Sequence, residues 1–360
     1  MFESFGFETL TAPEAAVWLG LALGLAFGAL AEITGFCLRR AVAGTAEERR
    51  PALGIWMAAL GTAILGTQGA VAAGLIDFSG HRFLAPDLPV LAILAGGLLF
   101  GAGMVLTRGC VSRLTVLTGT GNLRAALVLV VFAVVAHATL KGVLAPLRTT
   151  LGSVTIPLGG SAGLGALPGG QLIWALMLAA AAVALACCSG ASRRHLALAA
   201  FLGLLVPAAW LGTGLVLQDD FDPIPMESLS FTSPAAETLF WSVASTAIAP
   251  GFGVGLIGGV LAGAFGTSLI GGRFRWQSFE GPAQTGRYLA GAALMGLGGV
   301  LAGGCTVGAG LSGVPTLGLS ALLALAAIVA GGMTTNAALN ARSRAGSAGS
   351  SAIHPTRQRA

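Results

Sequence analysis

Of the 360 residues, 55% are hydrophobic and only 9% are charged, and the mean hydropathy is +0.86. Soluble domains carry roughly 25% charged residues, so this composition excludes a soluble globular protein and indicates one that crosses a membrane several times. The formal net charge of +5 lies in short segments rather than along one stripe, which excludes a nucleic-acid-binding protein.

The apolar residues fall into long runs that are separated by short polar segments. A helix needs about 20 apolar residues to cross the core of a bilayer, and about nine runs come near that length. The sequence therefore predicts an all-α polytopic membrane protein with about nine transmembrane helices. The runs are 15–38, 53–76, 88–107, 123–145, 169–188, 195–217, 251–271, 287–304 and 315–336.

Charged residues flank these runs unevenly. Basic residues follow the first run, separate the fifth from the sixth and fill the C-terminal tail, whereas acidic residues crowd the N-terminus and the segment 218–237. By the positive-inside rule, the N-terminus is predicted to be periplasmic and the C-terminus cytoplasmic. The N-terminus lacks a basic segment, short apolar core and cleavage site, so no removable signal peptide is expected.

The first two runs contain polar candidates. Glu32 lies in the first run, which ends at Cys37, and Gln68 lies in the second. An ionisable group within a membrane span is rare and usually faces a cavity or a partner. Glu32 is therefore either the buried partner of an arginine or a residue on a transport path.

The third run stops at a break that contains Arg108, Gly109, Cys110 and Arg113. Irregular backbone at membrane depth is tolerated only where protein or water satisfies its polar groups. A break also leaves free N–H groups at the start of a half-helix, and these groups together with the helix dipole favour an anion. The segment predicts a short re-entrant half-helix of the kind that repeat-built transporters use near the midplane.

The fourth run carries His137 and Lys141, the only lysine in the chain, one helical turn apart. This spacing puts both side chains on one face of the helix. They either snorkel toward the outer headgroups or attract an anion to an outer vestibule.

A later stretch repeats the pattern of the third run. The segment from Leu94 to Leu114 aligns with 289–309, so that Gly109 and Cys110 match Gly304 and Cys305, and Thr306 follows. The chain is thus predicted to be an internal duplication with pseudo-two-fold, inverted repeats. A weaker echo sets Cys37 over Ser268, but the predicted helix count leaves those two segments parallel, which conflicts with an inversion.

The organisation predicted from these features has four parts. They are a first repeat, 1–145, with Cys37 and Cys110; a connecting loop, helical hairpin and acidic periplasmic loop, 146–236; a second repeat, 237–341, with Cys305; and a disordered cytoplasmic tail, 342–360. The stretch 237–250 is too short to span a membrane, so it forms a half-helix or lies at the interface.

Five cysteines make an odd count, and none lies in a loop typical of a secreted disulfide framework. Cys187 and Cys188 are expected to be small apolar fillers. The histidines do not cluster with the cysteines, so neither a metal site nor a cofactor is expected. The three cysteines at breaks could be redox catalysts, metal ligands, small packing residues or groups that line a path. On a path, a weak S–H donor suits a polarizable sulfur anion because it binds without trapping.

Three segments carry a resemblance to a known family: GFCLRRA at 35–41, RGCVSRLTVLTGTGNLRAALV at 108–128, and GPAQTGRYLAGAALMGLGGVLAGGCTVGAGLSG at 281–313. They resemble the signature segments of the YeeE/YedE family of bacterial membrane proteins, whose studied members import thiosulfate. The resemblance implies an hourglass-shaped inner-membrane permease in which short re-entrant helices meet from both sides and Cys37, Cys110 and Cys305 contact the passing anion. The sequence departs from the family pattern after Arg113, where an asparagine is expected, and before the following glycines, where a basic residue is expected.

The expected function is therefore import of thiosulfate or a closely related anion, without enzymatic activity, with Arg108 and Arg113 attracting the anion inward. The alternatives are a transporter of another sulfur or selenium compound, or a membrane thiol redox or sulfur-transfer protein. The expected partners are the anion, membrane lipid and a cytoplasmic sulfur-carrier protein.

Overall fold

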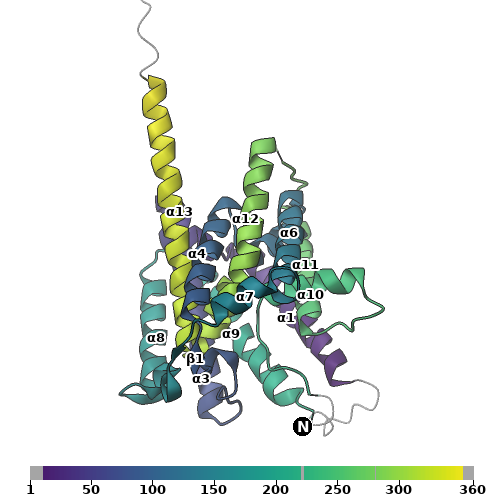
Figure 1. The fold of residues 1–360 in the computed structure, drawn as a ribbon, viewed down its shortest axis with the longest axis vertical. Helices are drawn as coiled ribbons and strands as arrows, with labels where there is room; N and C mark the ends of the chain where they lie inside the picture. Colours follow the sequence, from purple (N-terminus) through teal and green to yellow (C-terminus); the bar gives the residue numbers. More distant parts are fainter. Residues whose placement is uncertain (1–10, 220–222, 280, 352–360) are drawn as a thin grey trace, which may run out of the picture.

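The computed structural model describes residues 11–219, 223–279 and 281–351, and these form a predominantly helical protein (Figure 1). The long helices are α1 (Ala12–Thr34), α3 (Ala46–Ala72), α4 (Val90–Leu106), α6 (Leu123–Lys141), α8 (Gly170–Cys187), α9 (Arg193–Leu211), α11 (Phe252–Ile270), α12 (Pro282–Leu301) and α13 (Leu319–Ser351). The shorter helices are α2 (Leu38–Ala43), α5 (Val111–Gly119), α7 (Ala145–Gly152), α10 (Thr232–Val243) and the π-helices η5 (Gly212–Val216) and η6 (Thr306–Gly313). Single 3-10 turns are η2 (Arg82–Leu84), η3 (Gly159–Ser161), η4 (Leu164–Ala166) and η7 (Val314–Thr316), and the strands β1 (Asp87–Leu88) and β2 (Ile156–Pro157) pair antiparallel.

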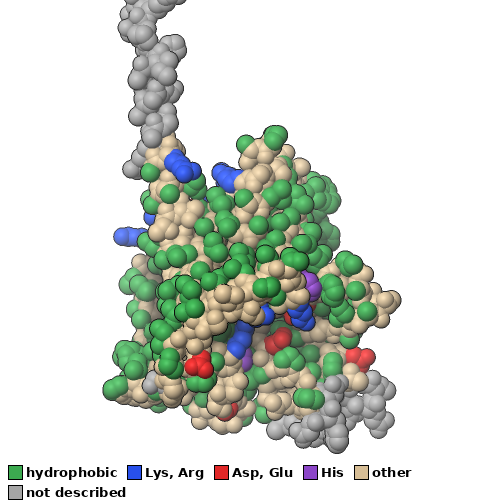
Figure 2. Space-filling view, viewed as in Figure 1, with side chains coloured by type: hydrophobic (Ala, Val, Ile, Leu, Met, Phe, Trp, Pro, Cys, Tyr) green, Lys and Arg blue, Asp and Glu red, His purple; other side chains and the backbone are tan. Residues whose placement is uncertain are grey.

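Within the described residues, nine helical segments are long and apolar enough to cross a membrane, which confirms the number predicted from the sequence. Figure 2 shows a broad band of hydrophobic side chains on the face in view, with acidic side chains below this band and basic side chains at the upper end of the molecule. The chain is a multi-pass membrane protein. The face at which α1 begins is called the N-terminal face below, and the face at which α13 ends is called the C-terminal face (Figure 1).

Capping residues explain where two of these helices begin. Thr11 and Glu14 form a capping box at the start of α1, and Thr45 and Glu48 form another at the start of α3. Each box satisfies backbone N–H groups that a helix N-terminus leaves without a partner. The second box begins α3 at Ala46, several residues before the apolar run that the sequence predicted from residue 53.

Glycines set the distance between α1 and α11. A Cβ atom added to Gly20, Gly24 or Gly28 would overlap the backbone of α11 at Phe252, Leu256 and Val260 in turn. Small residues at this spacing let two helix backbones approach closely. Because successive residues of α1 meet successive residues of α11, the two helices run parallel.

Glycines also let α4 and α12 approach closely, but here the two helices run in opposite directions. Gly96 lies against the backbone at Gly298, and Gly103 lies against the backbone at Gly291. These helices are therefore antiparallel, as two segments related by the predicted inverted repeat would be. The echo between Cys37 and Ser268 fails structurally, because Ser268 lies inside the continuous helix α11 rather than at a break.

The central part of the chain is more ordered than the sequence suggested. The connecting loop predicted at the start of 146–236 contains most of α7 and strand β2, and β2 pairs with β1 on the N-terminal face. The hairpin of α8 and α9 packs on α3, where Gly203 lies against the backbone at Ala59. It is thus part of the packed body rather than a simple linker.

Two further expectations differ from the structure. Helix α13 continues to Ser351, so it enters the segment predicted to be a disordered tail, although the serines and glycines there have low helix propensity; 352–360 lie outside the described residues. Cys187 and Cys188 are exposed rather than packed as fillers, because they lie at the end of α8, beyond its buried alanine stripe.

Candidate functional site

The three cysteines at breaks share one local geometry. Two residues before each cysteine, the backbone turns into the left-handed region, with φ of 64° at Gly35, 61° at Arg108 and 74° at Gly303. The residue between them closes the preceding helix by donating its N–H to the carbonyl five residues back, at 3.2 Å for Phe36, 3.1 Å for Gly109 and 2.9 Å for Gly304. Such a hydrogen bond satisfies a carbonyl that the helix end would otherwise leave free.

Each cysteine then becomes the first capping residue of a short helix. Cys37 precedes α2, Cys110 precedes α5 and Cys305 precedes η6. The sulfur of Cys305 accepts a hydrogen bond from the N–H of Gly308 at 3.3 Å. In the other two breaks, the corresponding N–H groups are those of Arg40 and Arg113. They lie near the sulfurs of Cys37 and Cys110, but neither forms a capping hydrogen bond.

These cysteines lie in the interior and close to one another. Cys37, Cys110 and Cys305 are 3%, 1% and 0% exposed, so none of them faces lipid. The side chains of Cys37 and Cys110 are neighbours, and the Cys110 sulfur lies 3.2 Å from the hydroxyl of Ser112. From the third break, the hydroxyl of Thr306 faces Cys110. That hydroxyl is buried and has no hydrogen-bond partner of normal geometry among the described residues.

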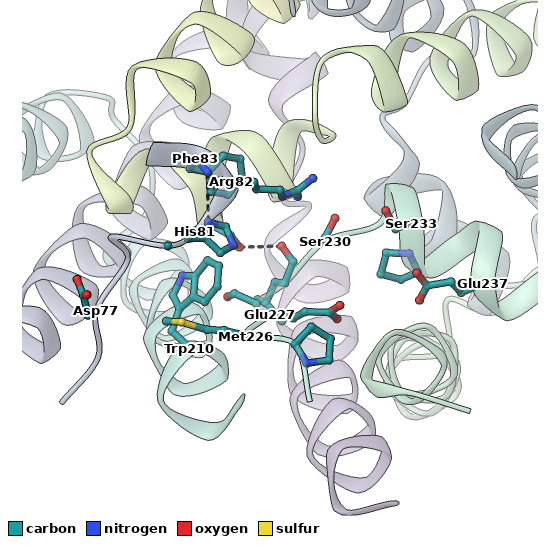
Figure 3. A pocket seen from close by; sticks show the side chains of 17 residues that line it. Asp77, His81, Arg82, Phe83, Trp210, Met226, Glu227, Ser230, Ser233 and Glu237 are labelled. Atoms are coloured by element: carbon teal, nitrogen blue, oxygen red, sulfur yellow. Dashed lines mark hydrogen bonds between the residues drawn. The ribbon is translucent and has the colours of Figure 1, made fainter. Parts of the chain in front are cut away.

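A cavity of about 510 Å³ leads from the N-terminal face toward Cys305 (Figure 3). This cavity, called the vestibule below, ends on η6 at Gly308 and Ser312, one of which donates to the Cys305 sulfur. Its other lining residues come from the loop after α3, from Trp210 of α9, from the extended segment before α10 and from α10 itself. They are Asp77, Gly80, His81, Arg82, Phe83, Trp210, Pro225, Met226, Glu227, Ser228, Leu229, Ser230, Ser233, Pro234 and Glu237.

Burial shifts the protonation of several groups in the vestibule. Burial lowers the pKa of His81 to about 4, with the positive charge of Arg82 adding to the effect, so the imidazole is neutral at pH 7. Burial raises the pKa of Glu227 to about 7, and the charge of Glu237 raises it further while that of Arg82 opposes the shift. Burial also raises the pKa of Glu237, against the opposing charge of Lys141.

Basic side chains collect near the opposite end of α4. Arg108 and Arg124 line a smaller pocket of about 120 Å³. Arg113, which follows Cys110 on α5, forms an ion pair with Glu32 of α1 at 3.5 Å and donates a hydrogen bond to the carbonyl of Ala31 at 3.2 Å. Glu32 also accepts from Arg273, at 3.3 Å.

The comparison with known families agrees with this arrangement. A family model described as sulphur transport matches residues 33–334, a span that includes all three breaks. The chain belongs to the sulphur transport family. This is the YeeE/YedE family, so the resemblance drawn from the three sequence segments is confirmed. No curated protein matches the chain.

Membership of this transporter family identifies the chain as a sulfur-compound transporter, with a small anion as its substrate. A transporter family also agrees with the expectation that the chain is not an enzyme. Among the described residues, no three His, Cys, Asp or Glu side chains cluster in a way that could hold a metal ion.

The other residues predicted from the sequence fall into two groups: Glu32 and Gln68 have polar protein partners, and His137 and Lys141 lie outside the vestibule lining. Glu32 is a partner of arginines, and its carboxylate is 9% exposed. Gln68 is buried, donates to the carbonyl of Pro315 at 2.6 Å and accepts from Gln171 at 2.9 Å, which is a structural role. His137 stacks on Phe240 of α10. The positive charge of Lys141 attracts the carboxylate of Glu237. Neither His137 nor Lys141 is among the residues that line the vestibule.

Sequence reasoning missed the residues that line the vestibule. Arg82, Glu227 and Ser230 lie in two loops that are far apart in the sequence and meet only through the fold. One signal was present. Arg82 is a basic residue in a loop that the positive-inside rule assigns to the outer face, where an arginine needs another explanation.

Proposed function

We propose that the chain is an inner-membrane permease that imports thiosulfate, or a closely related small sulfur-containing anion, through a central path lined by Cys37, Cys110 and Cys305. The observation that carries this proposal is the convergence of three buried thiols, each at the start of a short helix, beneath a vestibule that reaches one of those helices. A polypeptide that only packs cysteines as apolar fillers has no reason to repeat the same break around each of them.

The proposed path has an order. The anion enters the vestibule past Arg82 and reaches Cys305 at the start of η6. It next meets Cys110 with the hydroxyl of Thr306, then Cys37, and leaves past Arg113. Each step is short, because Thr306 faces Cys110 and Cys110 interacts with Cys37.

Hydrogen-bond donors along this path support an anionic substrate. The Thr306 hydroxyl and the indole N–H of Trp56 are both buried and have no partner among the described residues, and Trp56 lies against Gly310 of η6. Leaving buried donors unpaired costs about 1–3 kcal/mol each, so a solute that accepts from them gains that energy back. An S–H group adds a weaker donor, which holds an anion loosely enough to release it.

The proposed direction is from periplasm to cytoplasm, with the vestibule outside. Arg39, Arg40, Arg193, Arg194 and Arg342 lie on the C-terminal face or at helix ends near it, which the positive-inside rule assigns to the cytoplasm. Moving a dianion inward against a negative-inside potential costs about 2.3 kcal/mol per charge per 100 mV. Uptake therefore needs consumption of the substrate in the cytoplasm, for example through a sulfur-carrier protein, or a coupled cation.

The test is uptake of labelled thiosulfate by proteoliposomes that contain only this protein, in competition with sulfate and selenate. Cys110→Ala and Cys305→Ala are expected to lower uptake by at least about fivefold, since each removes a hydrogen bond worth about 1 kcal/mol and also leaves a gap in the path. The Ser variants should retain part of the flux. Cys187→Ser is the matched control, because that thiol is exposed, and it should transport like the wild type. Equal uptake by the Ala variants and the control would sink the proposed path.

One observation favours a second candidate, a membrane thiol redox or sulfur-transfer protein. Cys37 and Cys110 are neighbours, as a catalytic pair of thiols must be. Both are nearly inaccessible, whereas a redox pair needs access to a partner. Two results together would favour this candidate. The wild type would show no thiosulfate uptake, and Cys110→Ser would completely lose a thiol redox or sulfur-transfer activity that the wild type has. Stronger competition by selenium compounds than by sulfate would instead favour a transporter of another soft solute.

A further inference from the structure

The vestibule carries more negative than positive charge, which is unusual for the entrance of an anion path. Of the described residues that line it, Arg82 is the only cation when His81 is neutral, whereas Asp77, Glu227 and Glu237 contribute three carboxyl groups. If all three carboxylates were ionised, a doubly charged anion would enter against net negative charge. Some feature of the vestibule must offset this repulsion.

Arg82 is placed to bind the anion. Figure 3 shows its guanidinium group directed into the middle of the cavity, with Glu227 and Glu237 around the same space and Asp77 set apart. The group lies 4.9 Å from the centre of the Phe83 ring. None of the described acidic residues forms an ion pair with it within 4.0 Å, so its donors remain available to a ligand.

The backbone holds Glu227 at this entrance. The Glu227 N–H donates to the hydroxyl of Thr213 at 3.0 Å, and that hydroxyl donates to the Glu227 carbonyl at 2.7 Å. Two residues further on, the carbonyl of Leu229 accepts from Ser312 of η6 at 2.7 Å. Anchors on η5 and η6 therefore keep the carboxylate beside the route to Cys305.

The charged groups that act on Glu227 come from two sides. Arg82 of η2 attracts its negative form, and Glu237 of α10 repels it. His81 and Asp77 line the same cavity, and Lys141 of α6 acts on Glu237. Since the pKa of Glu227 is raised to about 7, the charge of this carboxyl changes near neutral pH.

We propose that the vestibule is a proton-linked anion site, in which Arg82 binds the small sulfur-containing dianion while Glu227 takes up a proton from the periplasm. This inference rests on the proposed function and adds to it the condition under which the anion is captured. A dianion next to Glu227 favours its neutral form, and by linkage a protonated Glu227 raises the affinity for the dianion by the same factor. Capture is therefore stronger in acidic medium.

Thiosulfate binding to the purified full-length protein, measured by titration calorimetry at pH 6 and pH 8, tests this inference. If only the form with neutral Glu227 binds, the apparent affinity should fall about tenfold between these values, in proportion to the neutral fraction. Titrations in buffers of different ionisation enthalpy should count about 0.9 proton taken up per anion at pH 8, which is the ionised fraction of Glu227 in the free protein.

Three variants separate the roles of the side chains. Glu227→Gln should bind thiosulfate with the same affinity at both pH values and take up no proton, and Arg82→Gln should lose binding at both. Asp87→Asn removes a carboxylate from the same face, outside the vestibule lining, and should keep the tenfold pH dependence. Glu237→Gln should move the midpoint of the pH dependence to lower pH, because it removes the charge that repels ionised Glu227; this variant provides a second test if Glu227→Gln does not fold.

The outcomes also separate this inference from the proposed function. Wild-type protein that transports thiosulfate but binds it equally at both pH values, without proton uptake, would overturn the proton linkage alone. An unchanged pH dependence in Glu227→Gln would do the same. Protein that neither binds nor transports thiosulfate would overturn both.

Discussion

Arg108 has a backbone conformation that glycine adopts freely and other residues adopt at a cost. Its φ of 61° corresponds to those of Gly35 and Gly303 in the other two breaks. Left-handed backbone costs roughly 1–2 kcal/mol for a residue with a Cβ atom. An arginine at this position therefore indicates that its side chain has a function. This side chain lines the pocket at the end of α4 together with Arg124.

This cost leads to a prediction for Arg108→Gly. The variant should be more stable by about 1 kcal/mol, because glycine relieves the strained backbone. It should also release thiosulfate more slowly, because one cation at the exit is lost. Thermal unfolding in detergent and uptake by proteoliposomes measure the two effects separately. Increased stability with unchanged uptake would remove Arg108 from the proposed exit.

Glu32 links three segments near the breaks at Cys37 and Cys110. Its buried carboxylate pairs with Arg113 of α5 and with Arg273 after α11. Glu32→Gln should lower the free energy of unfolding by about 1–3 kcal/mol, because it leaves the partly buried Arg113 with a weaker partner. Glu47→Gln, an exposed carboxylate in the first turn of α3, should change it by less than about 1 kcal/mol. Similar melting temperatures for the two variants would contradict a structural role for Glu32.

At the scale of elements, α1 and α11 owe their close contact to glycine, and α11 offers a matched pair of positions. A Cβ at Gly259 would overlap the backbone at Leu21, whereas a Cβ at Gly258 would meet nothing within 4 Å. Gly259→Ala should therefore destabilise the protein by about 1–3 kcal/mol through overpacking, and Gly258→Ala should stabilise it slightly through helix propensity. Thermal unfolding of both variants in the same detergent gives the comparison. Equal effects would mean that the helices can separate at little cost.

The helices and the cysteine breaks were predictable because their signals are local. A run of apolar residues gives a span, and the order glycine, any residue, cysteine marks the break at Gly35 and Cys37. The vestibule was not predictable from local pattern. Arg82 and Glu227 become neighbours only after α3, α9 and α10 have packed, and their segments show no periodicity that relates one to the other.

The whole molecule suggests how the conflict between the two sequence echoes is resolved. The order long, short, long, long, short, long describes α1 to α6 and also α9, α10, α11, α12, η6 and α13. Corresponding pairs of helices are in contact. Helix α1 contacts α11 as α9 contacts α3, α4 contacts α13 as α12 contacts α6, and α2 contacts α3 as α10 contacts α11. In this scheme α11 corresponds to α3, not to α1, so α1 and α11 need not be antiparallel.

This scheme makes the inverted repeat a more specific prediction than the sequence allowed. The counterpart of Cys37, the residue before α2, becomes Phe231, the residue before α10. Just as Cys37 interacts with Cys110, the backbone of Phe231 interacts with Cys305. Three of the four central positions in this scheme hold a cysteine. The fourth holds Phe231, whose ring centre lies 5.2 Å from that of Phe27.

The N-terminal and C-terminal faces lie on opposite sides of the membrane if each of the nine apolar segments among the described residues crosses it, because nine is an odd number of crossings. Cys187 and Cys188 are exposed at the end of α8 on the C-terminal face, and Asp87 is exposed in β1 on the other face. A membrane-impermeant maleimide should label Asp87→Cys in intact cells and the native Cys187 and Cys188 only in inverted vesicles. The buried Cys37, Cys110 and Cys305 should stay unlabelled in both and serve as internal controls. Labelling of Cys187 or Cys188 from outside would reverse the orientation, and the vestibule would then be the exit rather than the entrance.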